Sequence, residues 1–154
     1  MTIYLGESIP TPSKVVWTNG CYDVLHVGHS RLFSYCRQLC GEQENCKLVV
    51  GIDSDFRVKQ LKGNSRPINN QNDRAEMLLS IKGVSGVYIY DTREDLESIV
   101  LSLKPEVMVV GEEYASREVI GSQYSKSVKF FAKVEGYSTT NLMMKGSHES
   151  SQVK

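Results

Sequence analysis

The sequence of 154 residues has no excess of charge of one sign, no long apolar run and few cysteines. Its 18 basic residues balance its 18 acidic residues, so the chain is not built to hold a long polyanion such as DNA, although a small phosphate ligand needs only local positive charge. No apolar stretch reaches the roughly 20 residues of a membrane-spanning helix, and the N-terminus has no signal-peptide pattern. We therefore expect a cytoplasmic protein that binds neither nucleic acid nor a membrane.

The four cysteines have neither the spacing of a zinc site nor a C-x-x-C motif. Cys36 and Cys40 fall one helical turn apart, which would allow a two-ligand clip, but buried free thiols in a reducing compartment are commoner. Cys21 is interpreted as a loop-shaping residue, because nothing in the sequence supplies a partner that would activate its thiol. The fourth cysteine is Cys46.

The apolar pattern predicts strands that alternate with helices in one domain. Unbroken apolar runs are typical of strands buried on both faces of a parallel sheet, so helices should cover both faces. We expect strands at residues 14–18, 47–52, 84–90, 107–110 and 128–132. We expect helices at residues 28–39, 74–82 and 94–103, a short helical piece at 116–123, and a last helix that begins at residue 138.

The rest of the chain is predicted to be irregular. Residues 1–13 form an irregular leader, residues 14–145 form the domain, and residues 146–154 form a flexible polar tail. Residues 53–72 are predicted to be a long polar loop, and a loop of this length in a compact domain is usually functional or disordered.

Residues 18–29, T-N-G-C-Y-D-V-L-H-V-G-H, are the most informative segment. They join a predicted strand to a predicted helix, and anions bind where a helix begins because its first N–H groups are unpaired and its dipole is positive there. His26 and His29 share one helical face, so both can donate to one phosphate chain, and Gly28 lets a ligand approach the backbone. A lone histidine usually does no chemistry, but this pair indicates a phosphate site.

Other segments that follow predicted strands should lie at the same edge of the sheet, namely residues 53–62 and 111–114. Most basic residues in or beside the long loop would ordinarily be solvated surface charges. Their number here suggests a clamp on a triphosphate. These residues are Lys59, Lys62, Arg66 and Arg74.

Several catalytic motifs are missing. The chain has no G-x-x-x-x-G-K-[ST] loop, no G-x-G-x-x-G loop and no serine-centred nucleophile elbow. A site with hydrogen-bond donors and cations but without a poised nucleophile suits direct transfer between two bound phosphates. Catalysis then consists of positioning and of stabilising the charge on the phosphorus that is attacked.

Residues 18–29 resemble the signature of the cytidylyltransferase-like nucleotidyltransferases, whose defining element is H-x-G-H. Residues 58–69, V-K-Q-L-K-G-N-S-R-P-I-N, followed by Arg74, look like the adenylyltransferase domain of bacterial ADP-heptose synthase. Residues 136–141, G-Y-S-T-T-N, are similar to the C-terminal S-T-T signature of the family. The resemblance spans about residues 14–145 and is more specific for the superfamily than for the substrate.

The resemblance implies catalytic roles for four residues. His26 and His29 would bind the nucleotide phosphates and stabilise the pentavalent transition state, Lys59 would hold phosphates, and Arg74 would contact the nucleotide. The other nucleotide-binding residues that we predict are Thr18, Asn19, Gly20, Cys21, Tyr22, Asp23, Gly28, Gly111, Glu113, Ser138, Thr139 and Thr140. Asp23 would organise the loop. Mg²⁺ is implied as the charge-neutralising partner of the nucleotide, with no protein ligand assigned, and a homodimer is expected because family members are commonly dimers.

Two positions depart from the pattern of the heptose enzymes. Residues 110–114 are V-G-E-E-Y where those enzymes typically have K-G-G-D-Y, and they lean toward the G-D-D-W of glycerol-3-phosphate cytidylyltransferase. Lys133 stands where cytidylyltransferases usually have Arg, and lysine lacks the planar fork that binds phosphate bidentately.

We therefore expect a single α/β domain, with a Rossmann-like parallel sheet of five strands and helices on both faces. It would transfer a nucleotidyl group from ATP or CTP to a small phosphorylated sugar or polyol and release pyrophosphate. The leading version is a D-glycero-β-D-manno-heptose 1-phosphate adenylyltransferase. The alternative is a CTP-dependent glycerol-3-phosphate or polyol-phosphate cytidylyltransferase, and the second alternative is a non-catalytic nucleotide-binding regulator. A fragment of a larger bifunctional protein is a third reading, which the complete small domain and polar tail disfavour.

Overall fold

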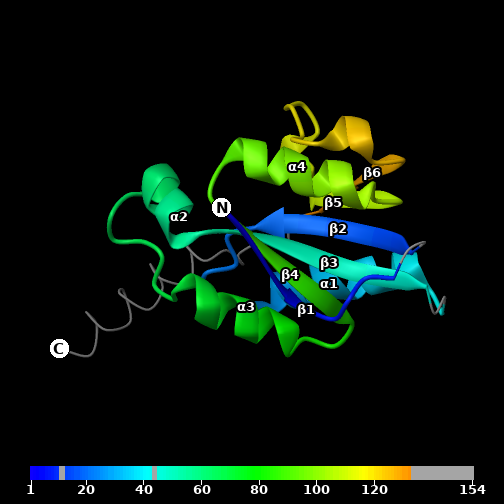
Figure 1. The fold of residues 1–154 in the computed structure, drawn as a ribbon, viewed down its shortest axis with the longest axis horizontal. Coiled ribbons are helices and arrows are strands. Elements are labelled where there is room, and N and C mark those ends of the chain that lie inside the picture. The colour runs from blue at the N-terminus through cyan, green and yellow to red at the C-terminus, as the bar shows by residue number, and fades with distance from the viewer. Residues whose placement is uncertain (11–12, 43–44, 133–154) are drawn as a thin grey trace.

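The apolar runs of the sequence pair into one sheet of six strands in the computed structural model, which describes residues 1–10, 13–42 and 45–132 (Figure 1). The strands are β1 (Thr2–Gly6), β2 (Lys14–Gly20), β3 (Cys46–Asp53), β4 (Val84–Tyr90), β5 (Val107–Gly111) and β6 (Ser127–Phe131). They lie in the order β1-β4-β3-β2-β5-β6, with β1 antiparallel to β4 and all other neighbours parallel. The five predicted parallel strands are thus confirmed.

The order of the strands changes direction at β2. From β2 the chain proceeds through β3 to β4 on one side, and it then returns to place β5 on the other side of β2. In open α/β sheets, ligands bind at the carboxyl ends of the strands where the direction of winding changes. The topology therefore marks the carboxyl ends of β2 and β5 as the place for a site.

Four α-helices connect the strands, and each begins at a side chain that accepts a hydrogen bond from the first turn. The helices are α1 (Val27–Cys40), α2 (Asp55–Lys62), α3 (Gln71–Leu79) and α4 (Arg93–Leu103), followed by the 3-10 turns η1 (Glu112–Tyr114) and η2 (Ser122–Tyr124). The N-cap residues of α2, α3 and α4 are Ser54, Asn70 and Thr92, residue types that satisfy the unpaired N–H groups of a helix start.

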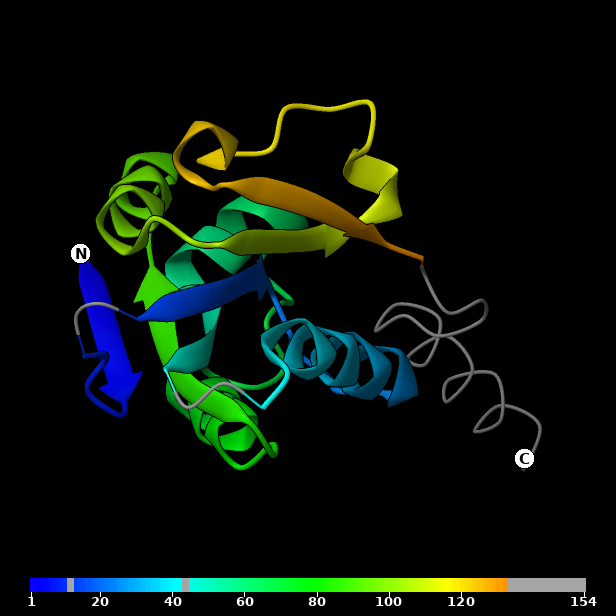
Figure 2. The same ribbon diagram turned by 90° about the vertical axis from the view of Figure 1, so that its right-hand side faces the viewer.

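The helices cover both faces of the sheet, as predicted. Figure 2 shows α4 on one side and α1 with α3 on the other. Phe33 and Leu78 belong to the apolar cluster under α1 and α3, whereas Trp17, Ile99 and Val100 belong to the cluster under α4. The central strands are thus buried on both faces, which explains their continuous apolar runs.

The prediction that residues 1–13 are irregular is wrong for residues 2–6. They form β1, which pairs with β4 in the register Thr2 to Tyr90, and the amino group of Met1 lies 3.2 and 3.0 Å from carboxylate oxygens of Asp91 and Asp95. The strand was missed because it is short and mostly exposed, so its apolar alternation is weak. Residues 2–6 form a strand because they pair with β4.

The prediction of a long loop at residues 53–72 is also wrong in part, because residues 55–62 form α2. Val58 is the buried residue of this helix, so the sequence has no apolar stripe there to signal it. The short helical piece expected at 116–123 is represented only by η2 at its end. The expected last helix lies outside the described residues.

The expectation of free thiols is wrong for Cys40 and Cys46, which form a disulfide between the end of α1 and the start of β3. Their Cα atoms are 5.5 Å apart, a proximity that follows from the packing of α1 on the sheet and that sequence spacing does not reveal. Cys21 and Cys36 are free.

Among the described residues, the structure has no helix with the length and apolar character that crossing a membrane requires.

Replacing both Cys40 and Cys46 with serine should lower the free energy of unfolding by about 2 kcal/mol, because the crosslink restricts the unfolded chain through a short loop. Equilibrium unfolding in urea measures the loss. A reductant should lower the stability of the unmodified protein by a similar amount and leave that of the double variant unchanged. Equal stability of the unmodified protein with and without reductant would contradict the crosslink.

Candidate functional site

A cavity of about 170 Å³ lies at the carboxyl ends of the parallel strands, where the direction of winding changes. Each of the four central strands contributes to its lining: Asn19 from β2, Asp53 from β3, Tyr90 from β4 and Gly111 from β5. The three segments that follow strands therefore do meet at one edge of the sheet, as the sequence predicts.

One wall of this cavity carries a connected set of polar groups. The Asn19 side chain accepts from Trp17 Nε1 at 2.9 Å and donates from Nδ2 to the Tyr90 hydroxyl at 3.3 Å. Arg57 Nε donates to Asp53 Oδ1 at 2.9 Å, and the Arg57 guanidinium lies 5.8 Å from the centre of the Tyr90 ring. Burial raises the pKa of the Asp53 carboxyl, while Arg57 acts in the opposite direction.

Apolar side chains also line the cavity, among them Leu96, Val110, Val119 and Ile120. A cavity that combines several fixed polar groups with apolar side chains suits a small polar molecule that carries hydroxyl groups.

The two motif histidines lie together at the start of α1. Their rings stack with centroids 3.8 Å apart, and the His29 and Tyr22 rings form a T-shaped pair with centroids 5.1 Å apart. His26 Nδ1 accepts from the Gly28 N–H at 3.1 Å, and His29 Nδ1 accepts from the His26 N–H at 3.3 Å. These bonds form the N-terminal cap of α1, so capping fixes the orientation of both rings.

The cap also determines the tautomer of the histidines. Because Nδ1 of each ring accepts a hydrogen bond, a neutral ring carries its proton on Nε2, where it can be donated to a phosphate oxygen. Burial, together with the charge of His26, lowers the pKa of His29 to about 4, so His29 is neutral at pH 7 in the free protein. The arrangement thus presents N–H donors at the positive end of the α1 dipole.

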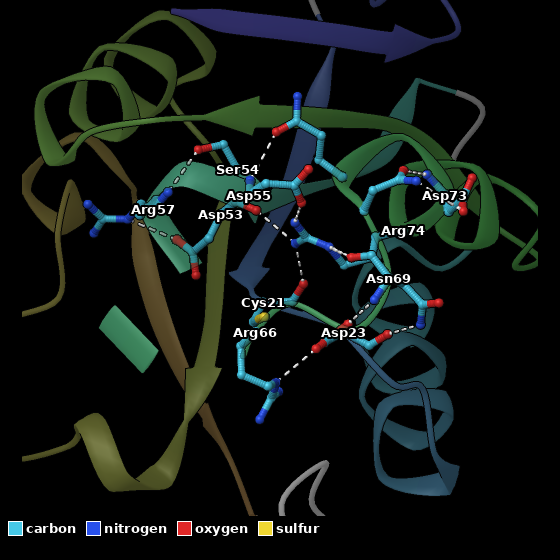
Figure 3. A network of polar contacts seen from close by, with 12 residues as sticks. Cys21, Asp23, Asp53, Ser54, Asp55, Arg57, Arg66, Asn69, Asp73 and Arg74 are labelled. Atoms are coloured by element: carbon cyan, nitrogen blue, oxygen red, sulfur yellow. Dashed lines mark hydrogen bonds and ion pairs between the residues drawn. The ribbon is translucent and has the colours of Figure 1, made fainter. Parts of the chain in front are cut away.

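Asp23 joins the motif loop to the segment that precedes α3 (Figure 3). Its carboxylate accepts from the N–H groups of Ile68 and Asn69 at 2.8 Å each and from Arg66 Nε at 3.0 Å. Its backbone carbonyl accepts from Asn69 Nδ2 at 2.6 Å. Burial disfavours the charged carboxylate, but these donors outweigh that effect and hold the pKa of Asp23 below its ordinary value.

Arg74, predicted to contact the nucleotide, lies buried beneath the loops with all three guanidinium nitrogens bonded to protein atoms (Figure 3). Nε donates to the Asn69 carbonyl at 2.9 Å, Nη1 donates to the carbonyls of Cys21 and Asp53 at 3.0 and 2.7 Å, and Nη2 donates to Asp55 Oδ1 at 2.9 Å. This geometry favours a positioning role for Arg74, in which it holds three loops at fixed distances from one another.

Other predicted residues of the motif loop shape the backbone. Tyr22 is buried with a φ of 50°, a left-handed conformation that turns the chain, and its hydroxyl lies 3.3 Å from that of Thr18. Gly20 lines the cavity. Burial raises the pKa of the Cys21 thiol, so Cys21 is not poised as a thiolate, in agreement with its interpretation as a loop-shaping residue.

The remaining predicted residues are more dispersed. Lys59 is exposed on α2, beside a polar hollow that Asp55 and Asp73 also line. Glu113 is exposed in η1, and its carboxylate lies beside the Cα of Gly111, where a larger residue would require the Glu113 side chain to move. Ser138, Thr139 and Thr140, together with Lys133, lie outside the described residues.

Sequence reasoning missed several residues of the cavity and of the loops around it. Arg57, Tyr90 and Leu96 each have an ordinary structural interpretation in sequence, as a helix, strand or core residue. Asn69 lies within the motif of residues 58–69, but its contacts with Asp23 span 46 positions. A polar residue at the end of a predicted strand, such as Tyr90, is the one signal that would have helped.

Asp23→Asn should destabilise the fold by about 3 kcal/mol, because it leaves the Arg66 charge buried without its partner. The depressed pKa means that the charge of Asp23 stabilises the fold fully above its ordinary pKa of about 3.9, and that this stabilisation is lost as the pH falls through the lower folded value. Urea unfolding should therefore show a constant difference from wild type between pH 5 and 7 and a smaller one below about pH 4.

Glu97→Gln is the matched control for Asp23→Asn, because Glu97 pairs with Arg93 at the surface. It should change the free energy of unfolding by less than about 0.5 kcal/mol at any pH. A similar, pH-independent loss in both variants would rule out the role assigned to the buried carboxylate.

The chain is similar to known proteins in sequence and in fold. The sequence profile of the cytidylyltransferase-like family matches residues 17–145. The chain is 41% identical over 131 residues to the bifunctional protein HldE of Campylobacter fetus subsp. fetus, and 45% identical over 130 residues to that of Campylobacter concisus. The matches cover 85% and 84% of this chain but 27% and 26% of those proteins, so the chain spans about a quarter of the length of these relatives.

Two solved structures share the fold. A lipopolysaccharide core biosynthesis protein from Thermoplasma volcanium aligns with a TM-score of 0.56 at 24% identity, over 81% of this chain and 98% of that one. A macrolide-efflux protein from Streptococcus pneumoniae aligns with a TM-score of 0.64 at 21% identity, over 88% of this chain and 52% of that one. With a family profile that extends over most of its length and includes the H-x-G-H motif, the chain belongs to the cytidylyltransferase-like family.

Proposed function

We propose that the protein is a nucleotidyltransferase that joins a nucleotidyl group from an NTP to a phosphorylated sugar and releases pyrophosphate. The observation that carries this proposal is the stacked pair His26 and His29 at the start of α1, where Nδ1 of each ring accepts a backbone hydrogen bond, at the same sheet edge as the cavity. ATP and D-glycero-β-D-manno-heptose 1-phosphate are the leading substrates, supported by the relatives named HldE.

The histidine pair suits stabilisation of charge on a phosphate chain. In the proposed reaction an oxygen of the acceptor phosphate attacks the α-phosphorus, a new P–O bond forms, and the bond to the β-phosphate oxygen breaks as pyrophosphate leaves. Charge on the non-bridging oxygens would be met by the two Nε2–H donors and by the N-terminus of α1. The attacking oxygen is already anionic, so the reaction needs no general base, in keeping with the raised pKa of Cys21.

The cavity suits the acceptor. Asn19, Asp53, Arg57 and Tyr90 offer both donors and acceptors within one wall, which matches a molecule with several hydroxyl groups. Their mutual hydrogen bonds fix them before a ligand arrives, and such preorganisation lowers the entropic cost of binding and orienting the acceptor.

Mg²⁺ is proposed to arrive with the nucleotide. Among the described residues, no three or more His, Cys, Asp or Glu side chains are grouped so that they could hold a metal ion. We therefore propose that substrate phosphates carry most of the coordination of the ion, as they commonly do for Mg²⁺, and no protein ligand is assigned. When bound, Mg²⁺ would neutralise negative charge on the triphosphate.

Further predictions from the sequence remain proposals. Phosphate binding by Lys59, Ser138, Thr139 and Thr140, formation of a homodimer, and residence in the cytoplasm all belong to this group. A CTP-dependent polyol-phosphate enzyme is the second candidate, and the G-E-E-Y sequence at residues 111–114 is the observation that favours it.

Pyrophosphate release from ATP and CTP, each tested with heptose 1-phosphate and glycerol 3-phosphate in the presence of Mg²⁺, should identify one productive pair. His26→Ala should reduce that rate by about 100-fold or more, because a donor to the transition-state charge is lost. Circular dichroism checks that the variant folds, since His26 also caps α1.

Lys126→Gln is the control for His26→Ala, because Lys126 pairs with Glu106 beside the amino end of β6. It should leave the rate unchanged. Nucleotide binding without pyrophosphate release from any pair would instead favour the non-catalytic regulator.

Nucleotide binding should be accompanied by proton uptake at pH 6. His29, with a pKa of about 4, is neutral in the free protein, and a bound triphosphate should raise that pKa because it stabilises the charged ring. The dissociation constant for Mg·ATP should therefore decrease as the pH falls from 8 to 6. Isothermal titration calorimetry in buffers of different ionisation enthalpy measures the proton number directly, and adenosine, which lacks phosphates, is the control. An identical binding enthalpy in all buffers would contradict the prediction.

A further inference from the structure

The basic residues that the sequence groups around the long loop have different environments in the structure. Arg74 is bonded to protein through every guanidinium nitrogen, and Lys59 and Lys62 are exposed on α2. Arg66 differs from all three, because its guanidinium is largely buried and only part of its hydrogen-bonding capacity is accounted for.

The Arg66 side chain is held by Asp23. It is 11% exposed, and its Nε donates at 3.0 Å to Oδ2 of a carboxylate that is completely enclosed. That carboxylate also accepts from two backbone N–H groups, at Ile68 and Asn69. Because these bonds fix the carboxylate, they fix the position of the guanidinium as well.

The Arg66 Nη2 group has no hydrogen-bond partner among the described residues although it is buried. A buried donor on a charged group is costly when it lacks an acceptor, and native structures seldom contain one without a reason. In Figure 3 the outer end of the Arg66 guanidinium is directed away from Asp23 and away from the rest of the network. The unpartnered donor is therefore held in place by the ion pair between Arg66 and Asp23.

Arg66 is connected to the motif histidines through Asp23. Asp23 precedes His26 by three residues in the loop that leads into α1, so Arg66 is fastened to the same loop that orients His26. A planar, permanently charged guanidinium is the side chain best matched to phosphoryl oxygens, and one held in place by a buried carboxylate loses little freedom on binding.

We propose that Arg66 binds a phosphoryl oxygen of a substrate through Nη2, with Asp23 as the residue that positions it, an inference that rests on the proposed nucleotidyl transfer. The phosphoryl oxygen belongs either to the nucleotide triphosphate or to the phosphate of the acceptor. Arg66 thereby joins the histidine pair as a phosphate-binding group of the site.

The test compares Arg66→Lys with wild type. Lysine keeps the charge and can keep the ion pair with Asp23, but it lacks the second nitrogen that Arg66 directs outward. The unfolding midpoint should therefore stay near that of wild type. Calorimetric binding of Mg·ATP, Mg·CTP, pyrophosphate, heptose 1-phosphate and glycerol 3-phosphate should show affinity reduced about tenfold or more for the ligand whose phosphate Arg66 holds.

The pattern of loss identifies the source of the phosphate. Weaker binding of the nucleotide and of pyrophosphate places the triphosphate at Arg66, whereas weaker binding of the sugar phosphate alone places the acceptor there. Arg37→Gln is the matched control, because it removes a guanidinium that bonds only the Lys82 carbonyl among the described contacts, in the last turn of α1. It should leave every affinity unchanged.

Two results would overturn the proposal. One is unchanged affinity of Arg66→Lys for all five ligands. The other is an equal loss for all of them together with a lower unfolding midpoint, which a purely structural ion pair would give. Because binding is measured without turnover, a failure of the proposed transfer reaction shows separately, as normal binding of the nucleotide with no release of pyrophosphate.

Discussion

The site depends on the buried carboxylate of Asp23. This single group accepts hydrogen bonds from Arg66, Ile68 and Asn69, and so it joins the loop after β2 to the segment between α2 and α3. The first segment follows a strand, whereas the second joins two helices. A buried charge with several donors is stable only in one geometry, so it gives a precise arrangement to loops that would otherwise be mobile.

Arg74 is a second buried charged residue that holds these loops in position. Its guanidinium donates to backbone carbonyls after β2, at the end of β3 and just before α3. These three segments are far apart from one another in the sequence. Asp23 and Arg74 have opposite charges, and both hold loops in fixed positions. A residue of the family signature can therefore be important without touching a substrate, because catalysis by positioning depends on loops that do not move.

The two halves of the proposed site come from different layers of the fold. The histidines belong to α1 on one face of the sheet, whereas the cavity lies against α4 on the other face. Both lie at the carboxyl edge of the sheet, because α1 begins after β2 and the cavity is lined by the ends of the central strands. In the proposed reaction, each substrate would bind on its own side of this edge.

The similarity to the HldE proteins bears on the proposed function. The HldE proteins are far longer than the matched region, and this chain corresponds to about a quarter of them. The family profile matches the region that contains the H-x-G-H motif, and residues 110–114 are V-G-E-E-Y. Val110, Gly111 and Tyr114 line the cavity, so in the proposed reaction the choice of nucleotide and acceptor would depend on the cavity.

The parallel strands, the helices α1, α3 and α4 and the H-x-G-H motif can be predicted from the sequence, because they depend on local periodicity and on short spacings. Tertiary structure alone decided the rest. The strand β1 forms by pairing with β4, and the Cys40–Cys46 disulfide depends on how α1 packs on the sheet. The helix α2 has no apolar stripe from which it could be predicted. Apart from the Asn69 carbonyl, five positions from Arg74, the partners of Asp23 and Arg74 lie 19 to 53 positions away, and no local pattern encodes contacts at such separations.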